Sequence, residues 1–329
     1  MEKHKTCVKL YIQAIILCTI LVLWAPAHGQ GDPSSLLKRI KIATIGAPNV
    51  ITIADWYSEW LDYEVSEQGT VDKALADSWG TAKSAGRPYI IMRSKGTEDV
   101  FIRAVEIDPV PQYRPLTTWG WNAIEITVED VDRAYERVLN GPFEIIGTPE
   151  TLGENSPLKA MQMIGPAGEV IYLTSNSGDR AKWNHPEPRS AIDRPFIMVV
   201  AGPNLSHLVN FYANKFSMKM KPLLNWPVDI IASAQSLPPD HIFQLAVLDL
   251  SERGNKIELD GYPRQHTGPR PHNPGQLPPG VAMVSFDVNN LDYIDVNFIS
   301  PPGILYGSSR AATFIGPTGE LTELIENTQ

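Results

Sequence analysis

Acidic side chains in strand-like segments are the residues of this sequence best suited to chemistry. Glu258 lies in "KIELDG", Asp287 in "VAMVSFDV" and Glu323 in "GELTELIE". Alternate residues of a strand share a face, so Asp287 points the same way as Met283 and Ser285. Three carboxyl groups brought close together raise the pKa of at least one of them. Such a cluster suits general acid–base catalysis or an oxygen-rich metal site.

Four further side chains are candidates for ligand binding: Glu125, Tyr172, His241 and Trp121. Glu125 shares a strand face with Ala123, and His241 begins the strand-like run "HIFQLAVLDL", where it could reach the rim of a cavity. Trp121 enters a strand-like run and could edge a cavity for an apolar or aromatic ligand. For Trp121, packing in the core is the alternative.

The sequence lacks the common catalytic signatures. It contains no HExxH, GxSxG, GxxxxGK[ST] or strand-linked GxGxxG pattern. A zincin, a triad hydrolase, a P-loop protein and a dinucleotide-binding enzyme therefore have no support in the sequence. The histidines outside the first 29 residues lie mostly in Pro-rich connectors, where a solvated loop residue is the expected role.

The first 29 residues read as a targeting segment. A start with three Lys precedes the apolar run "LYIQAIILCTILVLW", and "APAHG" offers small residues for cleavage after Ala27 or Gly29. The run is short for a membrane span. We therefore expect a cleaved signal peptide over residues 1–29 and a periplasmic or secreted protein without stable membrane anchoring, with an uncleaved anchor as the alternative.

Charge and cysteine usage limit the classes of partner and site. Removing residues 1–29 takes away three Lys and one Glu and changes the formal net charge from −9 to −11. An acidic protein of this kind is not expected to bind nucleic acid. Both cysteines, Cys7 and Cys18, lie in the leader. The exported chain thus has no thiol for a disulfide, a nucleophile or a thiolate metal site.

Two pairs of passages indicate a tandem duplication. "IGPAGEVIYL" (164–173) returns as "IGPTGELTEL" (315–324), and the strand–turn–helix passage through Pro48-Asn49 returns through Pro203-Asn204. The offsets between the copies are similar. Asn49, Asn204 and Asp130 are each placed to cap a helix. A weaker strand with a stunted helix follows in "VAMVSFDVNNLDYIDV".

Each quarter of the chain therefore reads as a strand, a helix and then further strands. In the first quarter the later strands are expected at "YEVSEQ", "PYIIMRS" and "VFIRAVEI", and in the third at "HIFQLAVLDL" and "NKIELDGY". Pro-rich connectors separate the quarters. The connector over residues 176–192 is the expected linker between domains at 38–175 and 193–326.

The modules, their order and the "GPxGE" phrase resemble the vicinal oxygen chelate superfamily, which includes glyoxalase I, extradiol dioxygenases, fosfomycin-resistance and bleomycin-resistance proteins. The resemblance covers residues from about Arg39 to Glu326. It implies an α+β fold in which four βαβββ modules form two tandem half-barrel domains. Each half-barrel would hold a small-molecule ligand on its concave face. The superfamily pairs modules within a chain or between subunits, so a homodimer stays open.

The resemblance also implies which positions would hold a metal ion. Glu258 and Glu323 match ligand positions on last strands, whereas the counted first-strand positions, Ile197 or Pro195 and Met283, cannot coordinate a hard ion well. In the N-terminal half, Ile42, Ala123 and Tyr172 fall at such places, with Arg103 near the fourth. A divalent ion (Fe, Zn, Mn or Ni) and no cofactor at all are equally compatible with this set.

Two functions follow from the resemblance. One is a lyase-, isomerase- or dioxygenase-like enzyme that acts on an aromatic or carbonyl compound, with Glu258, Glu323 and Asp287 as catalytic carboxylates. The other is a metal-free binding protein of the bleomycin-resistance type. Because Glu323 keeps the family's carboxylate where the first copy has Tyr172, we expect the C-terminal half to be the working half.

Overall fold

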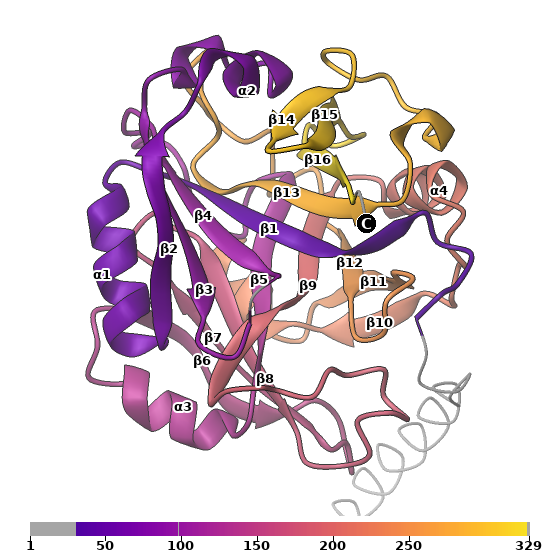
Figure 1. Ribbon diagram of the computed structural model, residues 1–329. Helices are drawn as coiled ribbons and strands as arrows, with labels where there is room; N and C mark the ends of the chain where they lie inside the picture. The colour runs from indigo at the N-terminus through magenta and orange to yellow at the C-terminus, as the bar shows by residue number, and fades with distance from the viewer. Residues whose placement is uncertain (1–30, 98, 328–329) are drawn as a thin grey trace, which may run out of the picture.

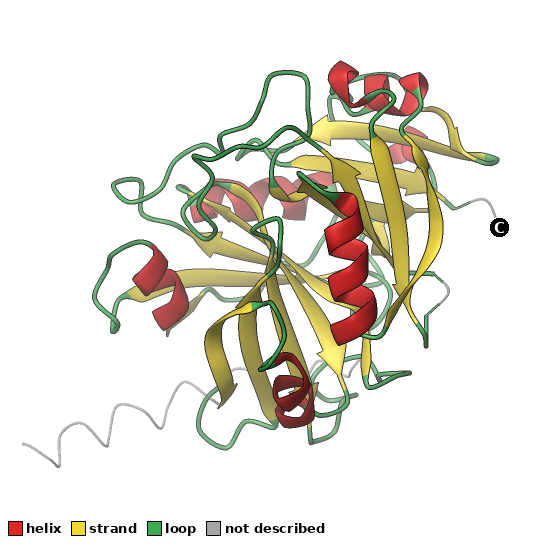
Figure 2. Ribbon diagram, turned by 90° about the vertical axis from the view of Figure 1, so that its left-hand side faces the viewer, coloured by secondary structure: helices red, strands yellow, loops and turns green. Residues whose placement is uncertain are grey.

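The computed structural model describes residues 31–97 and 99–327, so the leader and its expected cleavage lie outside the described residues. Strands predominate over helices, as Figure 2 shows, and the fold class is α+β as expected. In the described part of the chain no helix has the length and apolar character needed to cross a membrane.

The first two modules follow the expected order of elements. Module 1 comprises β1 (Leu37–Ala47), α1 (Val50–Trp60), β2 (Tyr63–Thr70), α2 (Lys73–Ser78), a 3-10 turn (Ala82–Ser84), β3 (Pro88–Ser94) and β4 (Phe101–Glu106). Module 2 comprises β5 (Gly120–Val128), α3 (Val131–Val138), β6 (Glu144–Thr151), β7 (Leu158–Ile164) and β8 (Val170–Asn176).

The last two modules repeat this order. Module 3 comprises β9 (Ile192–Gly202), α4 (Leu205–Lys215), β10 (Leu224–Pro227), α5 (Asp229–Ala234), β11 (Ile242–Asp249) and β12 (Lys256–Gly261). Module 4 comprises β13 (Gly280–Val288), a 3-10 turn (Leu291–Tyr293), β14 (Gly303–Tyr306), β15 (Ser309–Ile315) and β16 (Leu321–Glu326). The 3-10 turn is the stunted helix expected from the sequence.

The helices begin where their capping residues predict. Asn49 accepts hydrogen bonds from the amides of Ile51 and Thr52, and Asn204 accepts one from His207. Asp130 does the same for Asp132 and Arg133. Each side chain satisfies amides that the first helical turn leaves without a partner. The predicted helix starts are confirmed.

The strands form two eight-stranded sheets, each built from two modules (Figure 1). Modules 1 and 4 make one sheet, in the order β14-β15-β16-β13-β1-β4-β3-β2, which we call the outer-module sheet. Modules 2 and 3 make the other, in the order β10-β11-β12-β9-β5-β8-β7-β6, which we call the inner-module sheet. In each sheet the first strands of the two modules pair antiparallel at the centre.

This pairing corrects the expected one. We expected residues 38–175 to curl into one half-barrel and residues 193–326 into the other, but each sheet combines a module from each half of the sequence. The repeat reveals the modules and not their partners, because an edge of β1 can pair equally well with β5 or β13. Both sheets are complete within one chain.

The main hydrophobic core lies between the two sheets. It joins one face of β1, β4 and β13 to one face of β5 and β9, together with α1, α3 and α4. The opposite face of each sheet is concave and packs around smaller clusters of its own. Functional side chains must therefore be sought on these two concave faces.

The repeated "GPxGE" phrase joins consecutive modules across the two sheets. Tyr57 on α1 donates a hydrogen bond to the buried carboxyl of Glu169 at 3.3 Å. Tyr212 on α4 donates to Glu320 at 3.0 Å in the second copy. A Cβ on Gly165 would lie 2.0 Å from Glu169 Oε1, and the same holds for Gly316 and Glu320. The phrase is conserved between the copies because glycine leaves room for the glutamate.

Candidate functional site

The outer-module sheet brings together four side chains at one level of its concave face. Thr44 on β1 is in register with Arg103 on β4, and Ser285 on β13 is in register with Glu323 on β16. Since β1 and β13 are the central pair, the four side chains converge from four adjacent strands. The register thus places a last-strand residue opposite a first-strand residue in each module.

Glu323 is completely buried and accepts hydrogen bonds from four different side chains. The donors are Trp79 Nε1 at 2.8 Å, Ser285 Oγ at 2.5 Å, Tyr306 Oη at 2.8 Å and Arg103 Nη2 at 3.3 Å. A buried carboxylate requires such partners, because burial without them is costly. The donors occupy the lone pairs that a proton or a metal ion would need.

Arg103 is 2% exposed and carries the balancing positive charge. Its guanidinium donates to Thr44 Oγ1 at 2.9 Å and to Tyr306 Oη at 2.6 Å, and lies over the Trp79 ring at 4.6 Å. Burial alone would lower the pKa of Arg103, but Tyr306 and Glu323 outweigh it and raise the pKa. Arg103 is therefore charged, and the buried pair is neutral overall.

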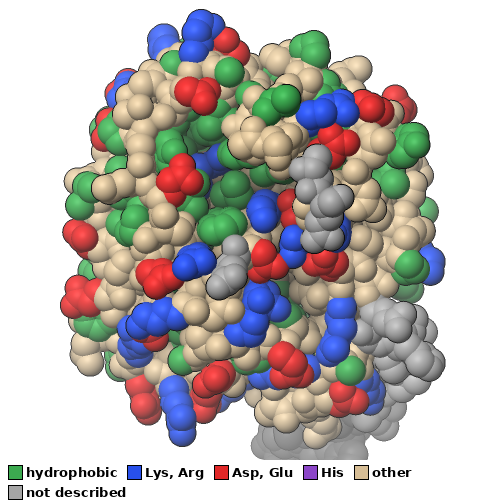
Figure 3. Space-filling view, viewed as in Figure 1, with side chains coloured by type: hydrophobic (Ala, Val, Ile, Leu, Met, Phe, Trp, Pro, Cys, Tyr) green, Lys and Arg blue, Asp and Glu red, His purple; other side chains and the backbone are tan. Residues whose placement is uncertain are grey.

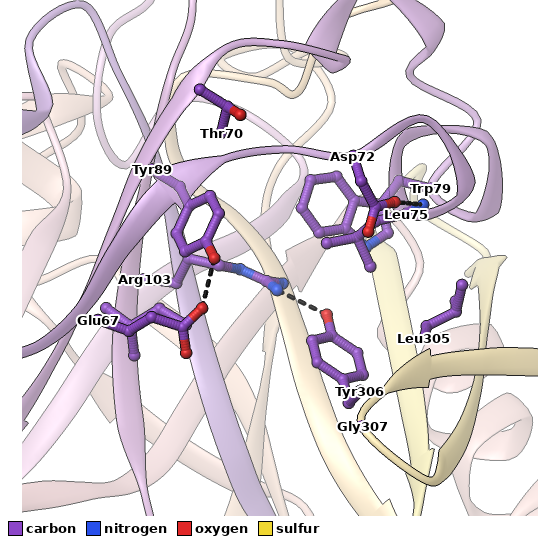
Figure 4. Close-up of a pocket in the computed structure, with 11 residues that line it drawn as sticks. Glu67, Thr70, Asp72, Leu75, Trp79, Tyr89, Arg103, Leu305, Tyr306 and Gly307 are labelled. Atoms are coloured by element: carbon purple, nitrogen blue, oxygen red, sulfur yellow. Dashed lines mark hydrogen bonds between the residues drawn. The ribbon is translucent and has the colours of Figure 1, made fainter.

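A cavity of about 390 Å³ opens above this pair (Figure 4). Arg103 forms part of its wall, and the remaining lining comes from β2, β3, α2 and the β14–β15 hairpin: Glu67, Thr70, Asp72, Leu75, Trp79, Tyr89, Ile91, Leu305, Tyr306 and Gly307. Figure 3 shows a recess with hydrophobic side chains between β2 and β14 on this face. The volume is within the usual range for small-molecule pockets.

The inner-module sheet carries a different set at the equivalent level. Glu125 on β5 is in register with Tyr172 on β8, and Val199 on β9 is in register with Glu258 on β12. Burial raises the pKa of Glu125 and, together with Asp260 and Glu125, raises that of Glu258 well above its usual range. Burial also raises the pKa of Asp260 to about 7. Among the described residues no arginine pairs with these carboxyl groups, and the charge of Lys256 lowers the pKa of Glu125 and Glu258 less than burial raises it.

A short helix packs on the concave face of each sheet, with different results. In the inner-module sheet, Ile230 and Ile231 of α5 pack against Ala123, Val199 and neighbouring apolar residues. A smaller cavity of about 240 Å³ remains beside Asp229 and β6–β7. In the outer-module sheet, α2 contributes Leu75 and leads into Trp79, and the larger cavity remains between this helix and the β14–β15 hairpin.

The expected cluster of Asp287, Glu258 and Glu323 does not form, because Glu258 belongs to the other sheet. Asp287 is buried, and it pairs with Arg39, whose Nε lies 2.6 Å from Asp287 Oδ2. The three acids were expected together on the assumption that modules 3 and 4 share a sheet. Of this set only Glu323 bonds to residues that line the larger cavity, namely Trp79, Arg103 and Tyr306.

The expected binding residues lie in several places. Trp121 is 1% exposed in the core between the sheets, where its Nε1 donates to the carbonyl oxygen of Leu321 at 2.8 Å. His241 precedes β11 and packs edge-on against Phe243 at 4.7 Å. Glu125 and Tyr172 do share the inner-module concave face. Trp121 and His241 line neither of the two cavities described above.

The residues in register with the last-strand residues lie two positions after the first-strand positions counted in the sequence. The register opposite the last-strand residues falls on Thr44, Glu125, Val199 and Ser285 and not on Ile42, Ala123, Ile197 and Met283. The correct face was chosen, since a shift of two keeps a side chain on the same side. Trp79, Tyr89 and Tyr306 were missed, because they come from segments that only the tertiary fold brings to the site.

Neither set of four fits a divalent metal ion. In the outer-module sheet a guanidinium stands beside the one carboxylate, and a positive charge there repels a cation. In the inner-module sheet Val199 offers no lone pair, which leaves two carboxyl groups and a phenol. Within residues 31–97 and 99–327 no three His, Cys, Asp or Glu side chains are grouped so that they could hold a metal ion.

Comparisons with known proteins agree on the fold. No protein-family model matches the sequence, and no curated protein sequence is significantly similar to it. The structure resembles glyoxalase I from Zea mays, with 16% identity and a TM-score of 0.59 over 88% of this chain and 92% of that one. It also resembles a proposed dioxygenase from Bacillus subtilis, with 14% identity and a TM-score of 0.60 over 90% and 87% of the two chains. The chain therefore has a tandem glyoxalase-like fold.

Proposed function

We propose that the protein binds a small organic molecule in the outer-module cavity and that it does so without a divalent metal ion. The observation that carries this proposal is the buried Arg103–Glu323 pair. Its Nη2–Oε2 distance is 3.3 Å, and neither side chain is more than 2% exposed. In a fold whose metal enzymes hold a cation at this level, the chain itself supplies the positive charge.

The hydrogen bonding of Glu323 favours binding over acid–base chemistry. A general base needs a free lone pair within reach of the substrate proton. Trp79, Ser285, Tyr306 and Arg103 all donate to this carboxylate, and it is fully buried. Glu323 therefore holds Arg103 in a fixed position in the wall of the cavity. At 14–16% identity, the activities named for the similar structures cannot be assigned to this chain.

One observation supports a second candidate, an enzyme that stabilises an oxyanion. Arg103 lines the cavity, and its Nη1 donates to Tyr306, which leaves the second Nη1 hydrogen for a ligand oxygen. A charged donor in a water-poor site can stabilise an enolate-like oxygen. Lyase- or isomerase-like turnover of a bound carbonyl compound would distinguish this function from binding alone.

We also propose that the protein works outside the cytoplasm. The support is in the sequence, where a basic start, an apolar run and a small-residue cleavage site precede the mature chain. Detection of the mature N-terminus after Ala27 or Gly29 in the exported fraction would test this proposal.

The binding proposal is tested by a screen of small aromatic and carbonyl compounds for thermal stabilisation in a chelating buffer. Leu305 lines the cavity, so Leu305→Trp fills it, whereas Leu223→Trp places the same ring on the surface, where Leu223 is 39% exposed. We expect compounds that stabilise the wild type and Leu223→Trp but not Leu305→Trp. Compounds that stabilise all three proteins equally, or only after metal is added, would contradict the proposal.

A further inference from the structure

We infer that the outer-module cavity selects ligands with an apolar or aromatic body and a positively charged, ammonium-like head. This inference rests on the proposed binding function and adds the chemical class of the ligand. Two exposed carboxylates and several apolar and aromatic side chains in the lining of the cavity carry it.

The two carboxylates reach the cavity from separate elements. Glu67 lies on β2, where its Oε1 accepts a hydrogen bond from Tyr89, and Asp72 precedes α2, where its Oδ1 accepts from the amide of Leu75 at 2.7 Å. Both side chains line the cavity and are exposed. Over residues 31–97 and 99–327 neither is within ion-pair distance of a lysine or arginine. Each keeps a second oxygen for a ligand.

The positive charge of Arg103 does not cancel the negative charge of the cavity lining. Its charge is balanced by Glu323, which is held behind it at 3.3 Å. Glu67 and Asp72 then remain as two uncompensated negative charges in the lining. An anionic ligand would meet both, whereas a cation would be attracted by both.

Apolar and aromatic side chains also line the cavity. Leu75, Ile91 and Leu305 contribute aliphatic surface, and Tyr89 and Tyr306 contribute rings (Figure 4). The Trp79 ring is already covered by the Arg103 guanidinium at 4.6 Å. Tyr89 also lines the cavity, and its hydroxyl is bonded to Glu67, so its ring is available to a second cation.

Three matched probes isolate the charge of the head group. Benzylamine is cationic at pH 7, benzyl alcohol is neutral and benzoate is anionic, while the ring is shared. We expect titration calorimetry at low salt to give the tightest binding for the amine and the weakest for benzoate. Glu67→Gln and Asp72→Asn should each weaken the amine by about three- to tenfold, since exposed charges are partly screened.

The amide variants keep the shape and one acceptor oxygen of each side chain and remove its negative charge. Benzyl alcohol should bind the wild type and both variants alike, and Glu150→Gln, at the inner-module cavity, should leave all three probes unchanged. Benzoate binding as tightly as the amine, equal losses for amine and alcohol, or no detectable binding of the amine would each overturn the inference. If, in that case, other screened compounds still stabilise the wild type but not Leu305→Trp, the proposed binding function stands and only the ligand class is wrong.

Discussion

The two sheets are built on one plan, yet they treat buried charge in opposite ways. The outer-module sheet pairs the buried carboxylate of Glu323 with a buried guanidinium and three neutral donors. The inner-module sheet holds Glu125, Glu258 and Asp260 without an arginine, and burial raises the pKa of each. A charge can thus be kept in a concave face by pairing, or removed from it by protonation.

The two concave faces also differ in how much open space they leave. The outer-module face keeps a cavity of about 390 Å³ beside its ion pair, whereas α5 fills much of the inner-module face. One concave face therefore keeps an open cavity beside a buried ion pair, and the other is packed by α5 and holds carboxyl groups whose pKa burial raises. The proposed binding cavity therefore lies on a sheet shared by the first and last modules and not within one half of the sequence.

The largest expected effect comes from breaking the ion pair. Arg103→Met leaves Glu323 buried without its cation, and removing one partner of a buried pair costs about 3–5 kcal/mol. Urea unfolding should show this loss in the free energy of unfolding. Arg103→Met combined with Glu323→Gln should recover part of it, because no unpaired charge remains. A loss below about 1 kcal/mol for the single variant would mean that the pair does not hold this face together.

The inner-module sheet should instead show a dependence on pH. The folded pKa of Asp260 is about 7, above its usual 3.8, so its stabilising contribution is complete below about pH 4 and lost as the pH rises to about 7. Asp260→Asn cannot lose a proton. It should match the wild type at pH 4 and exceed it at pH 8 by about 2–4 kcal/mol. If the difference in unfolding free energy between Asp260→Asn and the wild type were the same at pH 4 and pH 8, the raised pKa of Asp260 would be contradicted.

A smaller and symmetric effect is expected from the contacts between consecutive modules. Tyr57→Phe and Tyr212→Phe each remove one hydrogen bond to a buried glutamate, at a cost of about 1–2 kcal/mol. Tyr293→Phe is the control, since Tyr293 is 76% exposed. Thermal unfolding should show similar losses for the two buried tyrosines and none for the control. A loss in only one copy would show that the repeat no longer has one structural role.

Much of the fold could be predicted from the sequence, because its signals are local. Asn49, Asn204 and Asp130 start helices where their side chains can accept from free amides, and the predicted strands are present. The superfamily fold followed from the order of these elements. Which modules share a sheet could not be predicted, since pairing depends on long-range contacts that the repeat does not encode.

The candidate site could be predicted only in part, because it also depends on long-range contacts. Glu323 and Arg103 were both noted at ligand positions, but their contact joins the first module to the last. Trp79 and Tyr306, which complete the hydrogen bonds of Glu323, lie after a short helix and at the end of a strand whose positions are set by tertiary packing. Glu258 matched the same pattern as Glu323 and lies in the other sheet.

The central claim, that Arg103 takes the role of a metal ion in this fold, is tested most directly by equilibrium metal binding. The wild-type protein would be dialysed against Mn²⁺, Zn²⁺, Ni²⁺ and Fe²⁺ in turn, and its bound metal measured by mass spectrometry. We predict no stoichiometric binding of any of the four ions. One ion bound per chain and lost in Glu323→Gln would contradict the claim.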